Sequence, residues 1–237
     1  SCEVKEGTSY NFYVLTTPKD GDTTINLIMD RNICEDGSLT EEGKTCLVEW
    51  ISDEKYYEDV GGVIPDNLKN DDGMCQNGGI CKFNDKGPVT AMDYLYKATK
   101  DWIDVPNIKI NYTDEGNIGD YGYGTIITTN GVTKITKKDL TTVTSSYKDL
   151  KARLPYKSEL GEYDSKTKSN AYLYDYLDQS GTIQTNVISN IYGYWTLSSD
   201  SDSSYSMGIV NNYGYASSIP VYLDGNYGVR AVITLKL

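Results

Sequence analysis

Residues 192–237 decide the fold that this sequence predicts: YGYWTLSSDSDSSYSMGIVNNYGYASSIPVYLDGNYGVRAVITLKL. Two apolar stretches rich in aromatic and β-branched residues, 194–197 and 229–235, lie near the ends of this segment. The residues between them are mostly Ser, Tyr, Asn, Gly and Asp, a composition typical of loops that connect packed strands. The segment therefore predicts two strands that complete a sheet and a polar, aromatic surface between them.

Side chains suited to ligand contact gather in that polar surface. Tyrosine offers a large contact area at low entropic cost and is favoured in binding loops, and Asn and Asp add hydrogen bonds. The candidate binding residues are Tyr205, Asn211, Asn212, Tyr213, Tyr215, Tyr222, Asp224, Asn226 and Tyr227. The whole chain holds 22 tyrosines, so we expect many others to serve the core, each with a partner for its hydroxyl.

Composition excludes several classes of function. The formal net charge of −12 argues against nucleic acid or an anionic membrane surface as a partner, because both require a basic patch. The sequence has no histidine, which removes Ser-His-Asp and Cys-His catalysis and His-ligated zinc. No stretch approaches the roughly 20 apolar residues of a membrane span. Because the chain begins with Ser, we expect that an upstream signal peptide or anchor is missing, and that any membrane attachment depends on it.

All five cysteines lie early in the chain. Cys34 and Cys46 flank one short segment and Cys75 and Cys81 flank another, so disulfides 34–46 and 75–81 are the first choice, although four cysteines allow three pairings. Cys2 is then paired elsewhere, free, or a site of lipid attachment. Disulfides imply an oxidising compartment, which predicts an extracellular or cell-surface location.

Periodicity and turn signals predict strands, two helices and connecting loops. Ala91, Leu95, Ala98 and Trp102 form a single apolar stripe at helical spacing, and Thr90 with Asp93 approximates a capping box. Ser52 is the expected N-cap of the other helix, and Asn130-Gly131 is a strong hairpin turn signal. The expected elements are strands at 10–15, 25–30, 46–51, 108–112, 194–197 and 229–235, a hairpin at 125–136, helices at 53–60 and 90–102, a strand that ends at Leu154, and helical turns after Pro155 and at 170–177.

Short motifs in the second half of the chain carry a family resemblance. They are, in order, Arg153-Leu154-Pro155 with Glu159, Tyr194-Trp195-Thr196, and Gly228-Val229-Arg230 with Val232. This order resembles the C-type-lectin-like fold of bacterial proteins and of the formylglycine-generating-enzyme superfamily. The early INLIMDRNI and the later GPVTAMDYL are similar to segments of surface proteins of gut Firmicutes.

The resemblance implies a single α+β domain over 1–237, with small twisted antiparallel sheets, two or more helices, and long loops that present the ligand surface. Loop insertions are expected at about 61–87 and 113–147, and the N- and C-terminal strands should meet. It assigns structural roles to Arg153, Glu159, Trp195 and Arg230. If Arg230 is buried within its apolar strand, it needs a carboxylate partner, and Glu159 is the candidate. The alternative is that Arg230 lies on the exposed side of an edge strand.

Cofactor chemistry is not expected. Formylglycine-generating enzymes hold copper with cysteines in the C-terminal part of the domain, and this chain has no cysteine after Cys81. Residues 200–204 (DSDSS) resemble an acidic calcium loop, but Tyr205 follows where an EF-hand has Gly, so a solvated turn is favoured over calcium. The sugar-binding signatures of animal lectins, Glu-Pro-Asn and Trp-Asn-Asp, are absent, so no sugar specificity is carried over.

The function predicted from the sequence is therefore a secreted or surface-anchored, non-enzymatic binding module. Its ligand is expected to be a protein or a glycan at a cell surface, met through the Tyr/Ser/Asn-rich C-terminal loops. One alternative is a structural head domain of a pilus-like or surface-layer assembly. A carboxylate-based glycan hydrolase is less favoured, because the abundant acidic residues form no recognisable catalytic motif.

Overall fold

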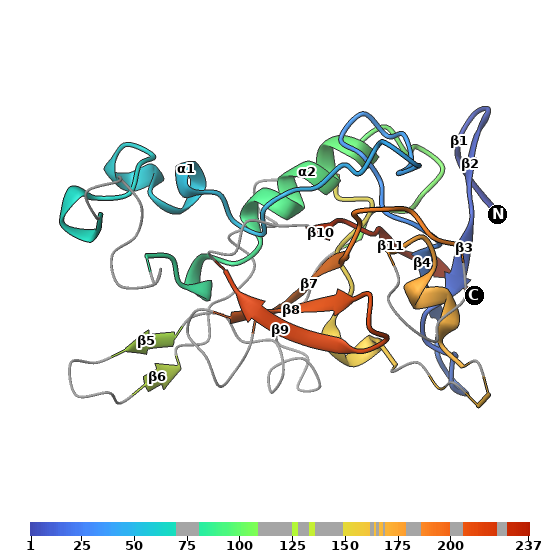
Figure 1. The fold of residues 1–237 in the computed structure, drawn as a ribbon. Helices are drawn as coiled ribbons and strands as arrows, with labels where there is room; N and C mark the ends of the chain where they lie inside the picture. The colour runs from blue at the N-terminus through green and yellow to red at the C-terminus, as the bar shows by residue number, and fades with distance from the viewer. Residues whose placement is uncertain are drawn as a thin grey trace.

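In the computed structural model, the described residues are 1–69, 81–108, 149–161, 164, 166–167, 169–178, 186–199, 206–221 and 227–237, together with the backbone of two strands at 125–127 and 133–135. Within this part of the chain, the structure is α+β, with small and mostly antiparallel sheets and two α-helices. Figure 1 shows the longer helix, α2, crossing above the C-terminal sheet, with both chain termini at the same end of the molecule.

A three-stranded sheet joins the beginning of the chain to its last strand. It has the order β11-β4-β3, with β3 at Phe12–Val14, β4 at Thr24–Met29 and β11 at Val232–Lys236. Both pairings are antiparallel, and Val232 lies opposite Ile28. The strands predicted at 10–15 and 25–30 correspond to β3 and β4, and the predicted meeting of the N- and C-terminal strands is confirmed. A separate hairpin of β1 (Cys2–Lys5) and β2 (Thr8–Tyr10) precedes this sheet.

The C-terminal sheet has four strands in the order β10-β7-β8-β9. These are β7 at Gly193–Ser199, β8 at Ser206–Asn211, β9 at Ala216–Pro220 and β10 at Tyr227–Gly228. The pairs β7–β8 and β8–β9 are antiparallel, whereas β10 runs parallel to β7. The strand predicted at 194–197 is confirmed within β7. Of the strand predicted at 229–235, only residues 232–235 lie in β11, since Val229 forms an isolated bridge to Ile33 and Arg230 and Ala231 are in non-strand backbone. The expectation of loops between these two strands is wrong for β8 and β9, which pair with each other and with β7.

Two α-helices occur near the predicted positions. Helix α1 (Asp53–Tyr56) begins after Ser52, whose hydroxyl accepts a hydrogen bond from Lys55 N at 3.3 Å. Helix α2 (Val89–Thr99) buries Ala91, Leu95 and Ala98 of the predicted apolar stripe, whereas Trp102, also buried, lies beyond the end of the helix. Thr90 is not the N-cap of α2, since its hydroxyl accepts a hydrogen bond from Ser52 N at 2.8 Å. None of the described helices is long and apolar enough to cross a bilayer.

Short 3-10 helices connect the main elements. They are η1 (Glu58–Val60), η2 (Asp66–Leu68), η3 (Asn84–Lys86), η4 (Lys157–Glu159) and η5 (Ala171–Tyr174). The helix predicted at 53–60 is divided into α1 and η1. The elements η4 and η5 lie at the helical turns predicted after Pro155 and at 170–177. The predicted strand that ends at Leu154 is reduced to one bridge between Arg153 and Val232.

The strand predicted at 46–51 is wrong, and the strand predicted at 108–112 is largely untested. Residues 46–51 form no strand, because Cys46 has a positive φ of 50° and Val48 hydrogen-bonds to the C-terminal sheet. Ile108 lies outside any strand, and residues 109–112 are not among those described. The hairpin predicted at 125–136 is present as β5 (Thr125–Ile127) antiparallel to β6 (Thr133–Ile135), although its turn residues fall outside the described part of the chain.

The core consists of two clusters of buried side chains that share strand β7. The larger cluster packs α2 and the tryptophans Trp50 and Trp102 against Trp195 and Leu197 of β7. The smaller cluster joins the three-stranded sheet to η5 and includes Ile28, Leu173, Tyr174, Tyr194, Val210 and Val232. Because neighbouring residues of a strand point to opposite faces, Tyr194 and Trp195 enter different clusters.

One predicted disulfide is present within the described residues. Cys34 and Cys46 are joined, with Cα atoms 5.2 Å apart. Cys81 is also disulfide-bonded, but the predicted pairing with Cys75 falls on a residue outside the described part. Cys2 is a free, partly buried thiol.

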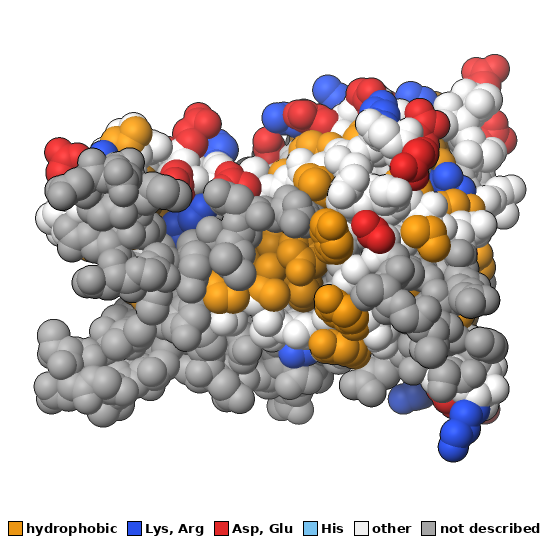
Figure 2. Space-filling view, in the orientation of Figure 1, with side chains coloured by type: hydrophobic (Ala, Val, Ile, Leu, Met, Phe, Trp, Pro, Cys, Tyr) orange, Lys and Arg blue, Asp and Glu red, His pale blue; other side chains and the backbone are white. Residues whose placement is uncertain are grey.

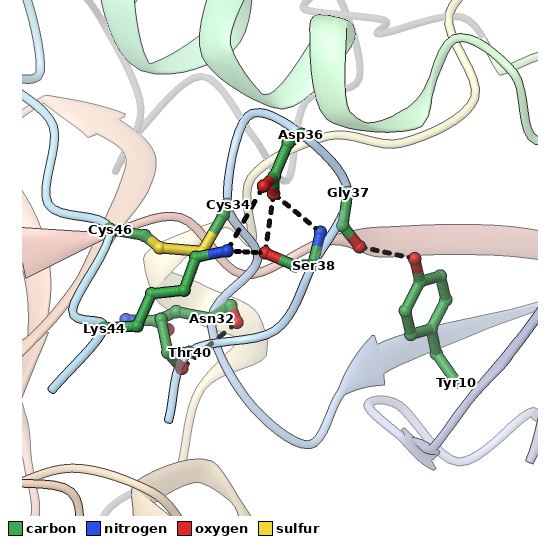
Figure 3. Close-up of a disulfide and its surroundings, with 9 residues drawn as sticks. All are labelled: Tyr10, Asn32, Cys34, Asp36, Gly37, Ser38, Thr40, Lys44 and Cys46. Atoms are coloured by element: carbon green, nitrogen blue, oxygen red, sulfur yellow. Dashed lines mark hydrogen bonds and ion pairs between the residues drawn. A yellow bond between two sulfur atoms is a disulfide. The ribbon is translucent and has the colours of Figure 1, made fainter. Parts of the chain in front are cut away.

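The loop closed by this disulfide is held by its own polar side chains (Figure 3). Asp36 accepts hydrogen bonds from Ser38 N at 2.9 Å and from Ser38 Oγ at 2.6 Å, and Lys44 Nζ lies 3.2 Å from its other oxygen. The Tyr10 hydroxyl donates to Gly37 O at 2.6 Å. This last bond connects the loop to the N-terminal hairpin.

Candidate functional site

A small cleft opens on the C-terminal sheet, next to the turn between β8 and β9. Its volume is about 310 Å³. Figure 2 shows hydrophobic side chains, tyrosine included, gathered over β7–β9. The cleft, called the tyrosine cleft below, is lined by Tyr192, Ile209, Asn211, Asn212, Tyr213, Tyr215, Ser217, Ile219 and Tyr227.

The β8–β9 turn presents two tyrosines at the rim of the cleft. Asn211 Oδ1 accepts a hydrogen bond from Tyr213 N at 3.0 Å, which is the geometry of an Asx turn. Gly214 has a φ of 95°, a conformation that glycine adopts without steric cost. Tyr213 and Tyr215 are 63% and 43% exposed, and their rings are nearly parallel, with centroids 6.4 Å apart. The turn thus leaves both aromatic rings exposed to solvent.

Asn212 connects this turn to neighbouring segments. Its backbone N–H donates to Tyr192 O at 3.0 Å, and its side-chain amide donates to Asp178 O. Asn211 and Asn212 are both buried. These two asparagines, predicted from the sequence as ligand contacts, therefore also fix the conformation of the turn.

Tyr227 forms a wall of the cleft. Its ring centroid lies 4.8 Å from that of Trp195, whose indole nitrogen donates to Val48 O at 2.6 Å. Val48 N in turn donates to Tyr227 O at 3.0 Å. A Cβ atom on Gly193 would lie 2.9 Å from the Tyr227 ring and 1.9 Å from Val210 O. Only glycine at this position allows the ring to approach the backbone of β7 so closely.

The floor of the cleft is apolar and comes from β8 and β9. Ile209 pairs with Ser217, and Met207 pairs with Ile219. Directly opposed residues of antiparallel strands share a face of the sheet, so Ile209, Ile219 and the Ser217 hydroxyl lie on the same side. Strand β7 pairs with the other edge of β8, and its Trp195 lies opposite Ile209. This face of the sheet therefore continues into the larger core cluster.

Hydroxyl groups distinguish the cleft tyrosines from core tyrosines. Tyr194, fully buried, donates its hydroxyl to Leu173 O at 3.1 Å. Within the described residues, no hydrogen bond is made by the hydroxyls of the cleft tyrosines, Tyr192, Tyr213, Tyr215 and Tyr227. Burial raises the pKa of Tyr227, and the nearby Tyr213 adds to the shift. These polar groups are available to a bound ligand.

The structure brings together part of the predicted binding set. Asn211, Asn212, Tyr213, Tyr215 and Tyr227 all line the cleft. The other predicted binding residues, Tyr205, Tyr222, Asp224 and Asn226, lie outside the described part of the chain.

Sequence reasoning missed the remaining lining residues, which are Tyr192, Ile209, Ser217 and Ile219. A signal for Ile209, Ser217 and Ile219 was their alternation in two short strands separated by an Asn-Asn-Tyr-Gly-Tyr turn. Tyr192 gave no comparable signal, because its position depends on the hydrogen bond from Asn212 across the sheet.

The residues assigned structural roles by resemblance are all largely buried. Arg153 binds Glu159 through two hydrogen bonds, Nη1 to Oε2 at 2.7 Å and Nη2 to Oε1 at 2.5 Å. Glu159 also accepts a hydrogen bond from Tyr156 N at 2.8 Å. This bidentate ion pair fixes the segment that leads into η4.

The predicted pairing of Arg230 with Glu159 is wrong, and so is the alternative of an exposed Arg230. Arg230 is fully buried, and its guanidinium donates to Leu173 O at 3.1 Å and to Asp175 O at 2.8 Å. It also lies over the Tyr194 ring, 4.3 Å from the centroid. Backbone carbonyls of the η5 segment therefore replace the expected carboxylate, while Glu159 is occupied by Arg153.

A second, larger cleft of about 660 Å³ lies between the N-terminal hairpin, the disulfide loop and the end of α2. In contrast to the tyrosine cleft, its lining is highly charged and includes Lys5, Glu35, Asp36, Lys97, Lys100 and Asp101. The hydrogen bonds from the Ser38 side chain and backbone, followed by that from Lys44, lower the pKa of Asp36 to about 2. A carboxylate held ionised in this way is unsuited to act as a general acid at neutral pH.

The described part of the chain holds no cluster of metal-ligating side chains. Among the described residues, no group of three or more Cys, Asp or Glu side chains is placed to hold a metal ion. The acidic segment 200–204, weighed above as a calcium loop, lies outside them.

Comparison of the chain with protein-family models, with curated proteins and with solved structures finds no match.

Proposed function

We propose that this chain is a non-enzymatic ligand-binding module that is secreted or held at a cell surface, and that its domain is of the C-type-lectin-like type. The ligand is a protein or a glycan, and it binds at the tyrosine cleft beside the β8–β9 turn. The proposal rests on one observation above all: tyrosines line a cleft with hydroxyls that make no hydrogen bond within the described residues.

Further features support the fold and the location. The last strand pairs with an early one, Trp195 is buried beneath the C-terminal sheet, and Arg153 and Glu159 form a buried ion pair. The Cys34–Cys46 disulfide favours an oxidising compartment.

The proposal is tested by binding to an array of glycans and host-cell proteins, with and without calcium. The protein is compared with a double variant, Tyr213→Ser with Tyr215→Ser. A matched control is Tyr13→Ser, which removes a tyrosine 39% exposed and outside the cleft. We expect hits that the double variant loses and the control keeps, because both turn tyrosines are exposed and their removal should cost little stability.

Three outcomes would contradict the proposal. An array without hits, or hits that the double variant keeps, would favour the structural head domain or a site elsewhere. Turnover of an array glycan, abolished by single Asp or Glu substitutions, would favour the hydrolase.

A further inference from the structure

We infer that the tyrosine cleft binds an uncharged sugar residue and does so without calcium. This inference rests on the proposed function and narrows it, since it names the chemical class that the same site accepts. Four properties of the cleft support the inference: its charge, the chemistry of its surfaces, its free hydrogen-bonding groups and its size.

The cleft is electrically neutral in a strongly acidic protein. Its lining consists of tyrosine, asparagine, isoleucine and serine, none of which is ionised at neutral pH. The protein as a whole carries a formal net charge of −12. An acidic sugar, such as a sialylated or sulfated one, would find no cation in the cleft and would be repelled by the overall field. The lining also offers no carboxylate for calcium, which prefers several charged oxygen ligands.

The surfaces of the cleft are apolar on their faces and polar at their edges. Ile209 and Ile219 form the floor, and the rings of Tyr213 and Tyr227 stand beside it. A pyranose ring has the matching character, with C–H groups on its faces and hydroxyls around its edge. Aromatic rings that carry a hydroxyl suit this pattern, because one end of the side chain is apolar and the other is polar.

Free hydrogen-bonding groups lie among these apolar surfaces. Asn211 is 7% exposed and uses its Oδ1 atom to hold the turn, while its Nδ2 atom donates no hydrogen bond within the described residues. This Nδ2 atom is accessible to solvent, because the buried polar atoms without a partner belong to other residues. The hydroxyls of the cleft tyrosines both donate and accept, as sugar hydroxyls require.

The size of the cleft favours a small unit over a protein surface. A volume of about 310 Å³ is at the lower end of the roughly 300–1,000 Å³ of small-molecule sites. A stable protein partner instead covers on the order of 800 Å² on each side. A proline-rich peptide also binds aromatic grooves, and it is therefore included as a competing probe.

The test measures binding of soluble probes by calorimetry and ligand-observed NMR. The probes are neutral mono- to trisaccharides of hexoses and N-acetylhexosamines, their sialylated and sulfated counterparts, and a proline-rich peptide, each with and without EDTA. We expect the neutral sugars to bind, the acidic counterparts to bind more weakly, and EDTA to have no effect.

Two variants locate the sugar. Tyr213→Ser removes a ring from the rim, and Asn211→Asp keeps the oxygen that holds the turn while it removes the free amide donor. Each should weaken binding of a neutral sugar by about tenfold or more. Asn67→Asp adds the same charge at an exposed position outside the cleft and should leave binding unchanged.

The outcomes separate this inference from the proposed function. Preference for acidic sugars, loss of binding in EDTA, or sugar binding that both cleft variants keep would overturn the inference. Binding of only the peptide or an array protein, lost in Tyr213→Ser, would overturn the inference and leave the proposed function standing. If no probe and no array ligand depends on Tyr213 or Tyr215, both fail.

Discussion

One face of the C-terminal sheet, the closed face, packs against the smaller core cluster. The other face packs against the larger core cluster but opens at one end into the tyrosine cleft, and it is called the open face below. Tyrosine and aliphatic side chains occur on both faces. On the closed face, Tyr194 and Val210 pack against Leu173, and the Tyr194 hydroxyl donates to the Leu173 carbonyl. On the open face, Tyr213 and Tyr227 line the cleft, and their hydroxyls bond to no other described residue. Residue type therefore does not separate core from site here.

The difference between the faces lies in how polar groups are satisfied. The η5 segment covers the closed face and turns its carbonyls toward Arg230, so a buried cation and a buried phenol share one network. A buried network of this kind is stabilising only when its members are paired. On the open face, the hydroxyls of the cleft tyrosines have no such partner among the described residues. Substitutions on the two faces test this contrast.

Removal of the Arg230 guanidinium should destabilise the closed face most. In Arg230→Met, the Asp175 carbonyl loses the guanidinium donor and the Leu173 carbonyl keeps only the Tyr194 hydroxyl among the described residues, which should lower the free energy of unfolding by about 3 kcal/mol. Urea unfolding followed by circular dichroism measures the loss. Lys236→Met, at an exposed position of β11, is the control and should change stability little. Equal stability of the two variants would show that the network is dispensable.

Crowding at Gly193 should disturb the open face. In Gly193→Ala, the new methyl group would lie 1.9 Å from Val210 O and 2.9 Å from the Tyr227 ring, so both the backbone of β8 and the ring must move. We expect a loss of about 1–3 kcal/mol in the free energy of unfolding, together with loss of ligand binding.

The control for this change is Gly21→Ala. Gly21 has a φ of 95° and no heavy atom within 4 Å of an added Cβ, so this variant measures backbone strain without crowding. If Gly193→Ala costs no more than Gly21→Ala and keeps its ligand, the close approach of Tyr227 does not shape the cleft.

The smallest effect concerns pH and Tyr194. Burial raises the pKa of Tyr194 above its usual value near 10.0. Between that value and the raised pKa, the unfolded chain has lost a proton that the folded chain retains, so stability falls as pH rises. Below pH of about 10 the contribution is fully present.

The variant Tyr194→Phe should therefore show a shallower alkaline decline, and at neutral pH a cost of about 1 kcal/mol for the lost hydrogen bond. Urea unfolding at neutral pH and at several steps above about pH 10 measures both quantities. Tyr10, Tyr57 and Tyr172 also have raised pKa values, so part of the decline remains in the variant. A slope identical to that of the unchanged protein would contradict the assignment to Tyr194.

Local signals predicted much of the fold. The hairpin at 125–136, the apolar stripe of α2 and the Ser52 cap all correspond to elements close to their expected positions. These features depend on residues a few positions apart, which a sequence shows directly. The prediction of a strand at 46–51 was wrong, because the conformation of this segment depends on residues far away in the sequence. Val48 bonds to Tyr227 and Trp195, and nothing near it in the sequence indicates those partners.

The site was predicted in part for the same reason. Tyr213, Tyr215 and Asn211 belong to one turn, so their composition alone indicated a binding surface. Tyr192 is placed by a hydrogen bond across the sheet. Arg230 was given a carboxylate partner because charge complementarity can be read from a sequence, whereas a set of carbonyls gathered by a 3-10 turn cannot.

The pairing of β4 with β11 also affects how the chain acquires its fold during synthesis. Strand β4 lies between β3 and β11, and Ile28 pairs with Val232, so the two partners leave the ribosome about 200 residues apart. Until residues 232–236 have emerged, one edge of β4 remains unpaired and open to association with other chains. Completion of the three-stranded sheet is therefore a late event, and a nascent chain needs its exposed edge protected until then.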